Sequence, residues 1–209
     1  MSWDPEAAAA RDGVLAAVRA AIDVPPGVTP VILIDGPSGA GKSTLADLLV
    51  ARWPGERAPT LVRMDDLYPG WDGLDAASDA IATELVEPLV RTGRGRWRRW
   101  DWAADEPAEW HEVADPAALI VEGCGTLSRR ATPFARLAIW ADADDVLRKR
   151  RALDRDGATF AAHWEQWQGE FERYVARENP RRNATLRIDV TDWPLGGRRL
   201  RRDGTTVGS

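Results

Sequence analysis

The residues at positions 36–44 have the types and the spacing of a phosphate-binding loop. Gly36, Gly41, Lys42 and Ser43 fit the pattern G-x-x-x-x-G-K-[ST]. Glycines in such a loop let backbone N–H groups turn toward one anion, the lysine reaches the β- and γ-phosphates, and the serine hydroxyl holds Mg²⁺. We therefore expect ATP and Mg²⁺ as cofactors. The predicted nucleotide-binding residues are Gly36, Pro37, Ser38, Gly39, Ala40, Gly41, Lys42, Ser43 and Thr44.

Acidic residues follow two further segments that read as strands. Asp65 and Asp66 come after residues 60–64, and Glu122 comes after residues 118–121. The carboxyl ends of parallel strands meet at one edge of a sheet, where open α/β sheets bind their ligands. A carboxylate there can take the proton from a hydroxyl that is being phosphorylated. The alternatives are a turn capped by the aspartates and a salt bridge between Glu122 and an arginine.

The elements that must position these residues alternate along the chain. Short apolar runs predict strands at 31–34, 60–64, 118–121, 137–140 and 185–190. Helical spacing predicts helices at 5–22, 43–52, 75–91, 142–153 and 158–178. Alternating strands and helices predict an α/β fold with a doubly wound, parallel, five-stranded sheet.

We expect one domain over residues 1–209, with an acceptor-side insert at about 94–112 and a lid at about 148–160. Residues 94–102 read as a hairpin or an irregular insert. Strand, loop and helix follow one another around residue 36, which is the context that a phosphate-binding loop requires.

Composition excludes several classes of protein. The net charge is −5 and there is one cysteine, Cys124, so no internal disulfide can form. These features favour a cytoplasmic protein in a reducing compartment that does not bind nucleic acid. No apolar run approaches the roughly 20 residues of a membrane span, and residues 1–22 carry too many charges for a signal peptide. His111 and His163 have no companions at ligand spacing.

The sequence resembles the uridine kinase and phosphoribulokinase-like group of P-loop kinases. The resemblance rests on five places in matching order: residues 36–44, Met64-Asp65-Asp66-Leu67-Tyr68, Trp100-Asp101-Trp102, Ile120-Val121-Glu122-Gly123, and the arginines of 148–156. The signature of a GTPase (Asn-Lys-x-Asp) and that of an ABC ATPase (Leu-Ser-Gly-Gly-Gln) are both absent.

The resemblance implies a role for each matching residue. Asp65 is the expected base, and the catalytic set is Asp65, Lys42, Arg151 and Arg155, with the lid arginines on the phosphates. Ser43 and Glu122 are the expected metal ligands. The expected acceptor residues are Asp65, Tyr68, Trp71, Trp100, Trp102 and Glu122. The family tyrosine falls on Trp100 and a base-reading histidine falls near Asp105, so the acceptor site departs from that of uridine kinase. A tryptophan cluster that only packs on itself is the alternative.

These residues predict a kinase that moves the γ-phosphate of ATP to a hydroxyl of a small metabolite, a nucleoside in the first place. A nucleoside monophosphate kinase or another metabolite kinase is the alternative among enzymes, with Arg94, Arg96, Arg98 and Arg99 to hold a phosphorylated acceptor. A regulatory module that senses ATP without catalysis is the alternative of another class. The expected partner is a small-molecule acceptor, with no nucleic acid and no membrane; a homodimer is left open.

Overall fold

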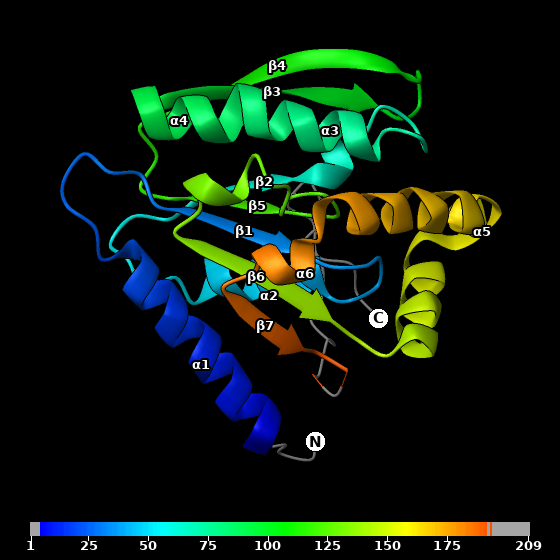
Figure 1. Cartoon of the computed structure of the whole chain (residues 1–209), viewed down its shortest axis with the longest axis horizontal. Coiled ribbons are helices and arrows are strands. Elements are labelled where there is room, and N and C mark those ends of the chain that lie inside the picture. Colours follow the sequence, from blue (N-terminus) through cyan, green and yellow to red (C-terminus); the bar gives the residue numbers. More distant parts are fainter. Residues whose placement is uncertain (1–4, 192, 194–209) are drawn as a thin grey trace, which may run out of the picture.

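A parallel sheet of five strands forms the centre of the protein. A computed structural model describes residues 5–191 and 193 (Figure 1). The strand order is β2-β5-β1-β6-β7, and every neighbouring pair is parallel. The strands are β1 (Val31–Asp35), β2 (Thr60–Arg63), β5 (Leu119–Glu122), β6 (Leu137–Asp142) and β7 (Leu186–Asp189). The predicted fold class is therefore confirmed, and all five predicted strands are present.

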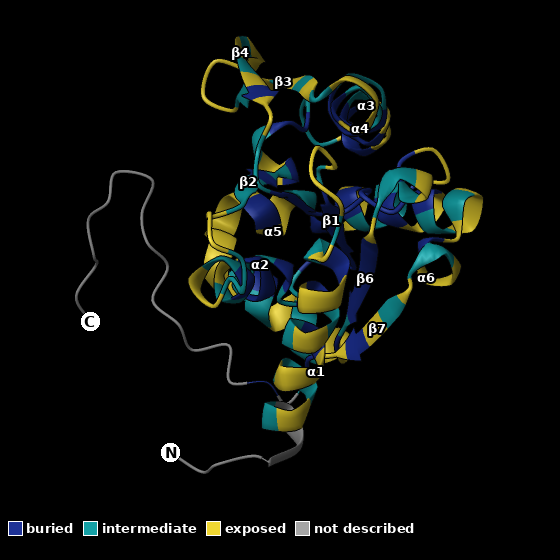
Figure 2. Cartoon of the chain, turned by 90° about the vertical axis from the view of Figure 1, so that its left-hand side faces the viewer, coloured by how far each residue is buried: buried dark blue, intermediate teal, exposed yellow. Residues whose placement is uncertain are grey.

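Helices cover both faces of this sheet, which explains why its strands are continuous apolar runs. Val31 and Leu33 of β1 pack into one core cluster, whereas Ile32 and Ile34 pack into the other. The first cluster is covered by α3 (Leu74–Ala80), a π-helical segment η2 (Ile81–Val86) and α5 (Asp145–Glu178); the second is covered by α1 (Pro5–Ile22) and α2 (Lys42–Ala51). Figure 2 shows the buried strands between these two layers.

The predicted helices differ from the observed ones at two places. The predicted helix 75–91 runs through α3, η2 and α4 (Glu87–Thr92), with the π-helical segment in its middle. The predicted helices 142–153 and 158–178 are two halves of α5, which meet at a sharp kink. Gly157 makes this kink with φ 68° and ψ −152°, a conformation that is nearly exclusive to glycine. The short segments α6 (Pro180–Asn183), η1 (Met64–Asp66) and η3 (Thr132–Phe134) complete the described chain.

The insert is a β-hairpin. Strands β3 (Arg94–Asp101) and β4 (Glu106–Ala114) pair antiparallel, with a shift of register between Arg98 and Trp100. The hairpin packs along η2 and α4, at the top of the molecule as drawn in Figure 1. Among the described residues, no helix has the length and apolar character needed to cross a membrane.

Candidate active site

A cavity of about 430 Å³ lies at the carboxyl edge of the sheet, where β1, β2 and β5 end. Its volume is in the usual range of small-ligand sites. The residues that line it come from the predicted phosphate-binding loop (residues 36–44, called the phosphate loop below), from η1 and the segment after it, from the hairpin turn, from the end of β5 and from α5. They are Ser38, Gly39, Lys42, Ser43, Asp65, Tyr68, Trp71, Trp102, Glu122, Cys124, Arg155, Asp156, Thr159, Phe160 and Trp167.

The phosphate loop has a backbone that requires glycine. Gly39 and Gly41 have φ of 79° and 84°. A Cβ atom on Gly39 would lie 1.9 Å from the carbonyl oxygen of Arg148, so the loop is also closely covered by the start of α5. Helix α2 begins at the end of the loop without a side-chain cap and without an acidic residue in its first turn. Its first N–H groups therefore have no competing side-chain acceptor there, and the glycine cradle fits a phosphate group.

Lys42 is buried at the wall of the cavity. Its Nζ donates to the carbonyl oxygen of Pro37 at 3.0 Å and lies 3.5 Å from Sγ of Cys124. The ammonium group is thus held over the loop that would receive the phosphates of a nucleotide.

Glu122 and Ser43 place two oxygen ligands together beside the loop. The Glu122 carboxylate is buried and accepts a hydrogen bond from Arg63 Nη1 at 2.8 Å. Burial and the charge of Asp65 raise the pKa of Glu122, while Arg63, Lys42 and a hydrogen bond from Ser43 act in the opposite direction. The salt bridge allowed as an alternative for Glu122 is therefore present, yet the residue also lines the cavity.

This donor set fits magnesium. A hydroxyl and a carboxylate are the oxygen ligands that Mg²⁺ takes when substrate phosphates complete its shell. In the described ranges, 5–191 and 193, no group of three His, Cys, Asp or Glu residues is arranged to hold a metal by itself. The site would therefore hold the ion jointly with a nucleotide.

Asp65 lines the same cavity as the loop. Its carboxylate is exposed, and its charge raises the pKa of both Glu122 and Arg155, so it lies near each of them. Its backbone oxygen accepts a hydrogen bond from Nε1 of Trp102 at 2.9 Å. The candidate base, the candidate metal ligand and one lid arginine thus face a single space.

Aromatic side chains form the far wall. The Tyr68 hydroxyl donates to the Cys124 carbonyl at 2.8 Å, and its ring meets Trp167 edge-on at 4.7 Å. Trp71 stacks on Phe160 at 5.6 Å and lies 5.1 Å from Trp102. Three of the four aromatic residues predicted for the acceptor site, Tyr68, Trp71 and Trp102, therefore line this cavity.

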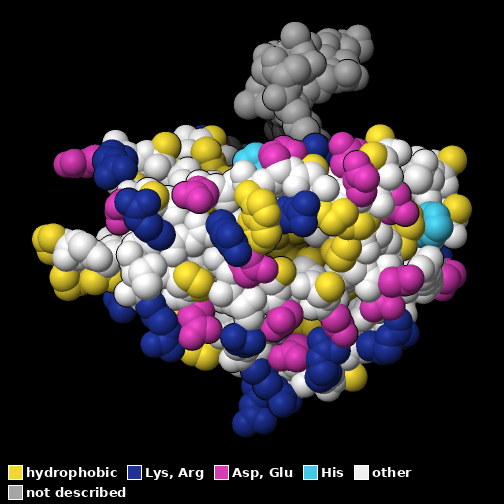
Figure 3. Space-filling model, turned by 90° about the horizontal axis from the view of Figure 1, so that it is seen from above, with side chains coloured by type: hydrophobic (Ala, Val, Ile, Leu, Met, Phe, Trp, Pro, Cys, Tyr) yellow, Lys and Arg dark blue, Asp and Glu magenta, His cyan; other side chains and the backbone are white. Residues whose placement is uncertain are grey.

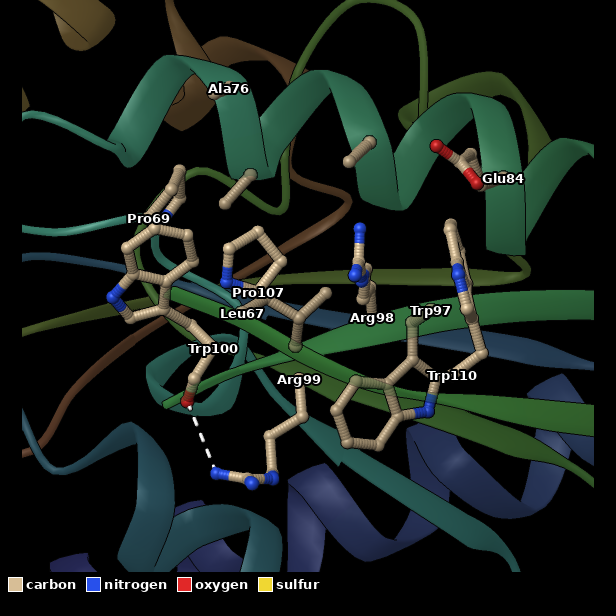
Figure 4. Close-up of a pocket in the computed structure, with 12 residues that line it drawn as sticks. Leu67, Pro69, Ala76, Glu84, Trp97, Arg98, Arg99, Trp100, Pro107 and Trp110 are labelled. Atoms are coloured by element: carbon tan, nitrogen blue, oxygen red, sulfur yellow. Dashed lines mark hydrogen bonds between the residues drawn. The ribbon is translucent and has the colours of Figure 1, made fainter. Parts of the chain in front are cut away.

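Trp100, the fourth of these aromatic residues, does not line this cavity. It lines a separate cavity of about 210 Å³ between the hairpin and the α3–η2 helix, with Trp97, Trp110 and Arg98 (Figure 4). The shift of register after Arg98 brings Trp100 toward this helix, whereas Trp102 lies beyond the strand and reaches the main cavity. Figure 3, which views this side of the molecule, shows apolar side chains around a hollow and charges of both signs between them.

The structure places the two predicted lid arginines, Arg151 and Arg155, in different surroundings. Arg155 lines the cavity and pairs with Asp156. Although burial acts to lower it, the pKa of Arg155 is raised by this hydrogen bond and by the charge of Asp65. Arg151 is not among the lining residues: its guanidinium donates to the carbonyl oxygens of Val190 and Thr191, at 3.5 and 2.9 Å. The structure thus places Arg151 on the chain after β7, and its predicted contact with the phosphates stays a prediction.

Sequence reasoning did not assign several residues of this region to the site: Cys124, Asp156, Thr159, Phe160 and Trp167 line the cavity, and Asp35 and Tyr174 join the loop to α5. Asp35 is fully buried and directly precedes the loop. A charged residue at the end of an apolar run was a signal for it. The three aromatic residues lie at helical spacing in the predicted helix 158–178, but spacing alone does not tell which structure their face covers.

Comparison with known proteins identifies the fold. No protein-family model and no curated protein matches the chain. A solved structure named as a possible uridine kinase from Bacillus stearothermophilus matches 88% of this chain and 100% of its own, with a TM-score of 0.62 and 17% identity. A putative fructose transport system kinase from Silicibacter sp. TM1040 matches 85% of this chain and 98% of its own, with a TM-score of 0.59 and 18% identity. The chain has the fold of these kinases. The predicted structural resemblance to the uridine kinase group is confirmed at the level of the fold.

Proposed function

We propose that this protein is an ATP-dependent kinase that phosphorylates a hydroxyl of a small, ring-bearing metabolite, a nucleoside in the first place. The observation that carries the proposal is that two groups share the lining of one cavity. The phosphate loop with Lys42 forms part of this lining, and Asp65 belongs to it as well. Kinase names among the proteins that share the fold agree with it.

The nucleotide would bind through its phosphates. Backbone N–H groups of the loop and the start of α2 would donate to phosphate oxygens, and Lys42 would exchange its contact with Pro37 for the β- and γ-phosphates. Ser43 and Glu122 would hold Mg²⁺, which neutralises charge on the phosphates when it is bound. Arg63 keeps the Glu122 carboxylate oriented toward this position.

The transfer itself needs a base and a cation near the reacting atoms. Asp65 would accept the proton of the acceptor hydroxyl while the hydroxyl oxygen forms a bond to the γ-phosphorus. The bond between the γ-phosphorus and the β-phosphate oxygen would break at the same time and release ADP. Arg155 lies beside Asp65 and would donate to oxygens of the transferring group. Trp71, Trp102 and Phe160 line the cavity and would supply an aromatic wall for a ring of the acceptor.

Two alternatives have less support. A phosphorylated acceptor needs cations in the cavity, but the hairpin arginines Arg94, Arg96, Arg98 and Arg99 do not line it. Arg96 lies over the ring of Trp110 and pairs with Glu84, and both of these partners line the second cavity. A sensor of ATP does not need a further carboxylate in the cavity, so the presence of Asp65 there favours catalysis.

An assay of ADP release across nucleosides, sugars and nucleotides tests the proposal. With a responding acceptor, Asp65→Asn should keep ATP binding and lower turnover by about 10²–10⁴-fold, since a positioned base contributes this much. Asp66→Asn is the matched control, because Asp66 is the neighbouring carboxylate and does not line the cavity. Turnover of Asp65→Asn near that of the wild type would refute the assignment of the base. Absence of acceptor-dependent ADP release across the panel would favour the sensor.

A further inference from the structure

The second half of α5 touches the phosphate-loop segment at two points. Nε1 of Trp167 donates to Oγ of Ser38 at 2.9 Å, and the Tyr174 hydroxyl donates to Oδ2 of Asp35 at 2.7 Å. Because seven residues make two helical turns, the two donors lie on the same face of the helix. All four side chains are buried. Helix α5, which lines one side of the cavity, is thus hydrogen-bonded to Asp35 just before the loop and to Ser38 within it.

Asp35 joins three segments that are far apart in sequence. Its carboxylate also accepts the N–H groups of Gly36, Gly125 and Leu127, at 2.7, 3.1 and 2.9 Å. It therefore connects the start of the phosphate loop, the segment after β5 and α5. A carboxylate can accept about four hydrogen bonds, and these four fill its capacity. Loss of one donor leaves a buried charge under-satisfied, which is costly.

The two halves of α5 hold the loop from different directions. The first half lies so close that a Cβ on Gly39 would meet the Arg148 carbonyl, and the second half supplies the two donors. Tyr174 is fully buried and is not among the residues that line the cavity. An effect of Tyr174 on a nucleotide is therefore indirect, and its one polar link to the loop is the hydrogen bond to Asp35.

We propose that Tyr174 and Trp167 are positioning residues for nucleotide binding, which fix the phosphate loop through Asp35 and Ser38. The loop must present several N–H groups to one anion, and small rotations of its backbone weaken such a site. Anchoring at both Asp35 and Ser38 keeps these N–H groups in place before the ligand arrives. The inference rests on the proposed nucleotide site but is independent of the acceptor.

Calorimetric titration with Mg²⁺ and a non-hydrolysable ATP analogue tests the Tyr174 bond. Tyr174→Phe keeps the ring and removes only the donor, and we expect affinity to fall about fivefold, a typical coupling between distant sites. Phe171→Leu is the matched control: Phe171 is buried on the same helix, against Trp140 and Tyr174, and has no polar contact with the loop. It should lower the urea midpoint while leaving affinity unchanged.

The outcomes separate this inference from the proposed function. If the wild type does not bind the analogue, the nucleotide site itself is wrong. If the wild type binds and Tyr174→Phe binds equally well, the positioning role is refuted. Equal weakening by Phe171→Leu would also refute it, because loss of packing alone would then explain the effect.

A double-mutant cycle tests the Trp167 bond. Trp167→Phe retains an aromatic ring beside Tyr68 and removes the donor to Ser38. If Trp167 acts through Ser38, the loss of affinity caused by Trp167→Phe should vanish in a Ser38→Ala background. Persistence of the full loss in that background would show that Trp167 acts by another route and would overturn this half of the proposal.

Hydrogen exchange gives a readout that a purely structural role would not move. In Tyr174→Phe, the amides of Gly36, Gly125 and Leu127 should exchange faster, because each donates to Asp35. Amides between β6 and β7 should exchange as in the wild type after correction for global stability. A uniform rise throughout the sheet would contradict a local role.

Discussion

The indole N–H of Trp102 donates to the backbone oxygen of Asp65 at 2.9 Å. Trp102 lies in the turn of the β3–β4 hairpin, and Asp65 lies in η1 after β2. The hydrogen bond therefore connects the insert with the segment that carries the candidate base. Trp102 also lines the cavity beside Trp71, so one side chain forms part of the acceptor wall and supports the backbone of Asp65.

We expect Trp102→Phe to raise KM for the acceptor by about three- to tenfold and to leave KM for ATP unchanged, since one hydrogen bond and part of a stacking surface are lost. Trp110→Phe is the control. Both tryptophans are partly exposed, 39% and 43%, but Trp110 lines only the second cavity. Steady-state kinetics with each substrate varied would check the prediction. An equal rise of the acceptor KM in both variants would contradict a specific role of Trp102, because any change in the hairpin would then have the same effect.

Gly39→Ala should abolish measurable nucleotide binding and destabilise the fold by about 2–4 kcal/mol, because the new Cβ both requires an unfavourable φ and meets the Arg148 carbonyl. Gly27→Ala separates these two causes. Gly27 has φ of 84°, but nothing lies within 4 Å of its added Cβ. Gly27→Ala should lower the free energy of unfolding by only about 1–2 kcal/mol and leave nucleotide affinity unchanged. Urea unfolding and analogue titration would measure both effects; equal affinities in the two variants would contradict the close-packed loop.

The two lid arginines should respond differently to removal. Arg155→Ala should lower kcat by about a hundredfold or more, as expected for a cation on the transferring phosphoryl group. Arg151→Ala should leave kcat near its wild-type value and lower stability by about 1–2 kcal/mol, since its hydrogen bonds to Val190 and Thr191 are lost. Single-turnover kinetics and thermal unfolding would check the pair. A larger loss of kcat in Arg151→Ala than in Arg155→Ala would indicate that Arg151 contacts the phosphates after all.

The stability loss in Tyr174→Phe should grow with pH. Burial raises the pKa of Asp35 above its ordinary value of 3.8, although Leu127, Tyr174, Gly36 and Lys42 favour the charged form. The Asp35 carboxyl group therefore binds its proton more tightly in the folded state than in the unfolded chain. Its contribution to the free energy of unfolding is greatest below pH 3.8 and declines as the pH rises through the folded-state pKa.

Tyr174→Phe removes a donor to the carboxylate and raises that pKa further. The free energy of unfolding should therefore differ more between variant and wild type at about pH 8 than at about pH 4.5. Urea titrations at the two pH values would measure this difference. An equal loss of unfolding free energy at both pH values would mean that Asp35 stays protonated in the folded protein.

Much of the site could be predicted because its signals are local. The glycines, Lys42 and Ser43 act within nine residues between one strand and one helix, so spacing along the chain specifies their geometry. Asp65 and Glu122 could be placed because each ends an apolar run, and parallel strands bring such ends to one edge. Both lie at the cavity as predicted.

Periodicity could not place the residues whose position depends on an irregularity. Arg151 and Arg155 are one turn apart in α5 and carry the same expectation, but only Arg155 reaches the cavity, close to the kink at Gly157. Trp100 and Trp102 are two residues apart, yet the register shift in β3 and the end of the strand send them to different cavities.

The sequence by itself determined the phosphate loop, the parallel α/β sheet and the edge at which its acidic residues gather. These follow from backbone chemistry and from apolar runs, which act over a few residues. Only the tertiary structure decided that Tyr174 binds Asp35 across 139 positions and that α5 closes the cavity with Phe160 and Trp167. Such contacts depend on the angle at a helix kink and on packing between distant segments, which no local pattern of residues records.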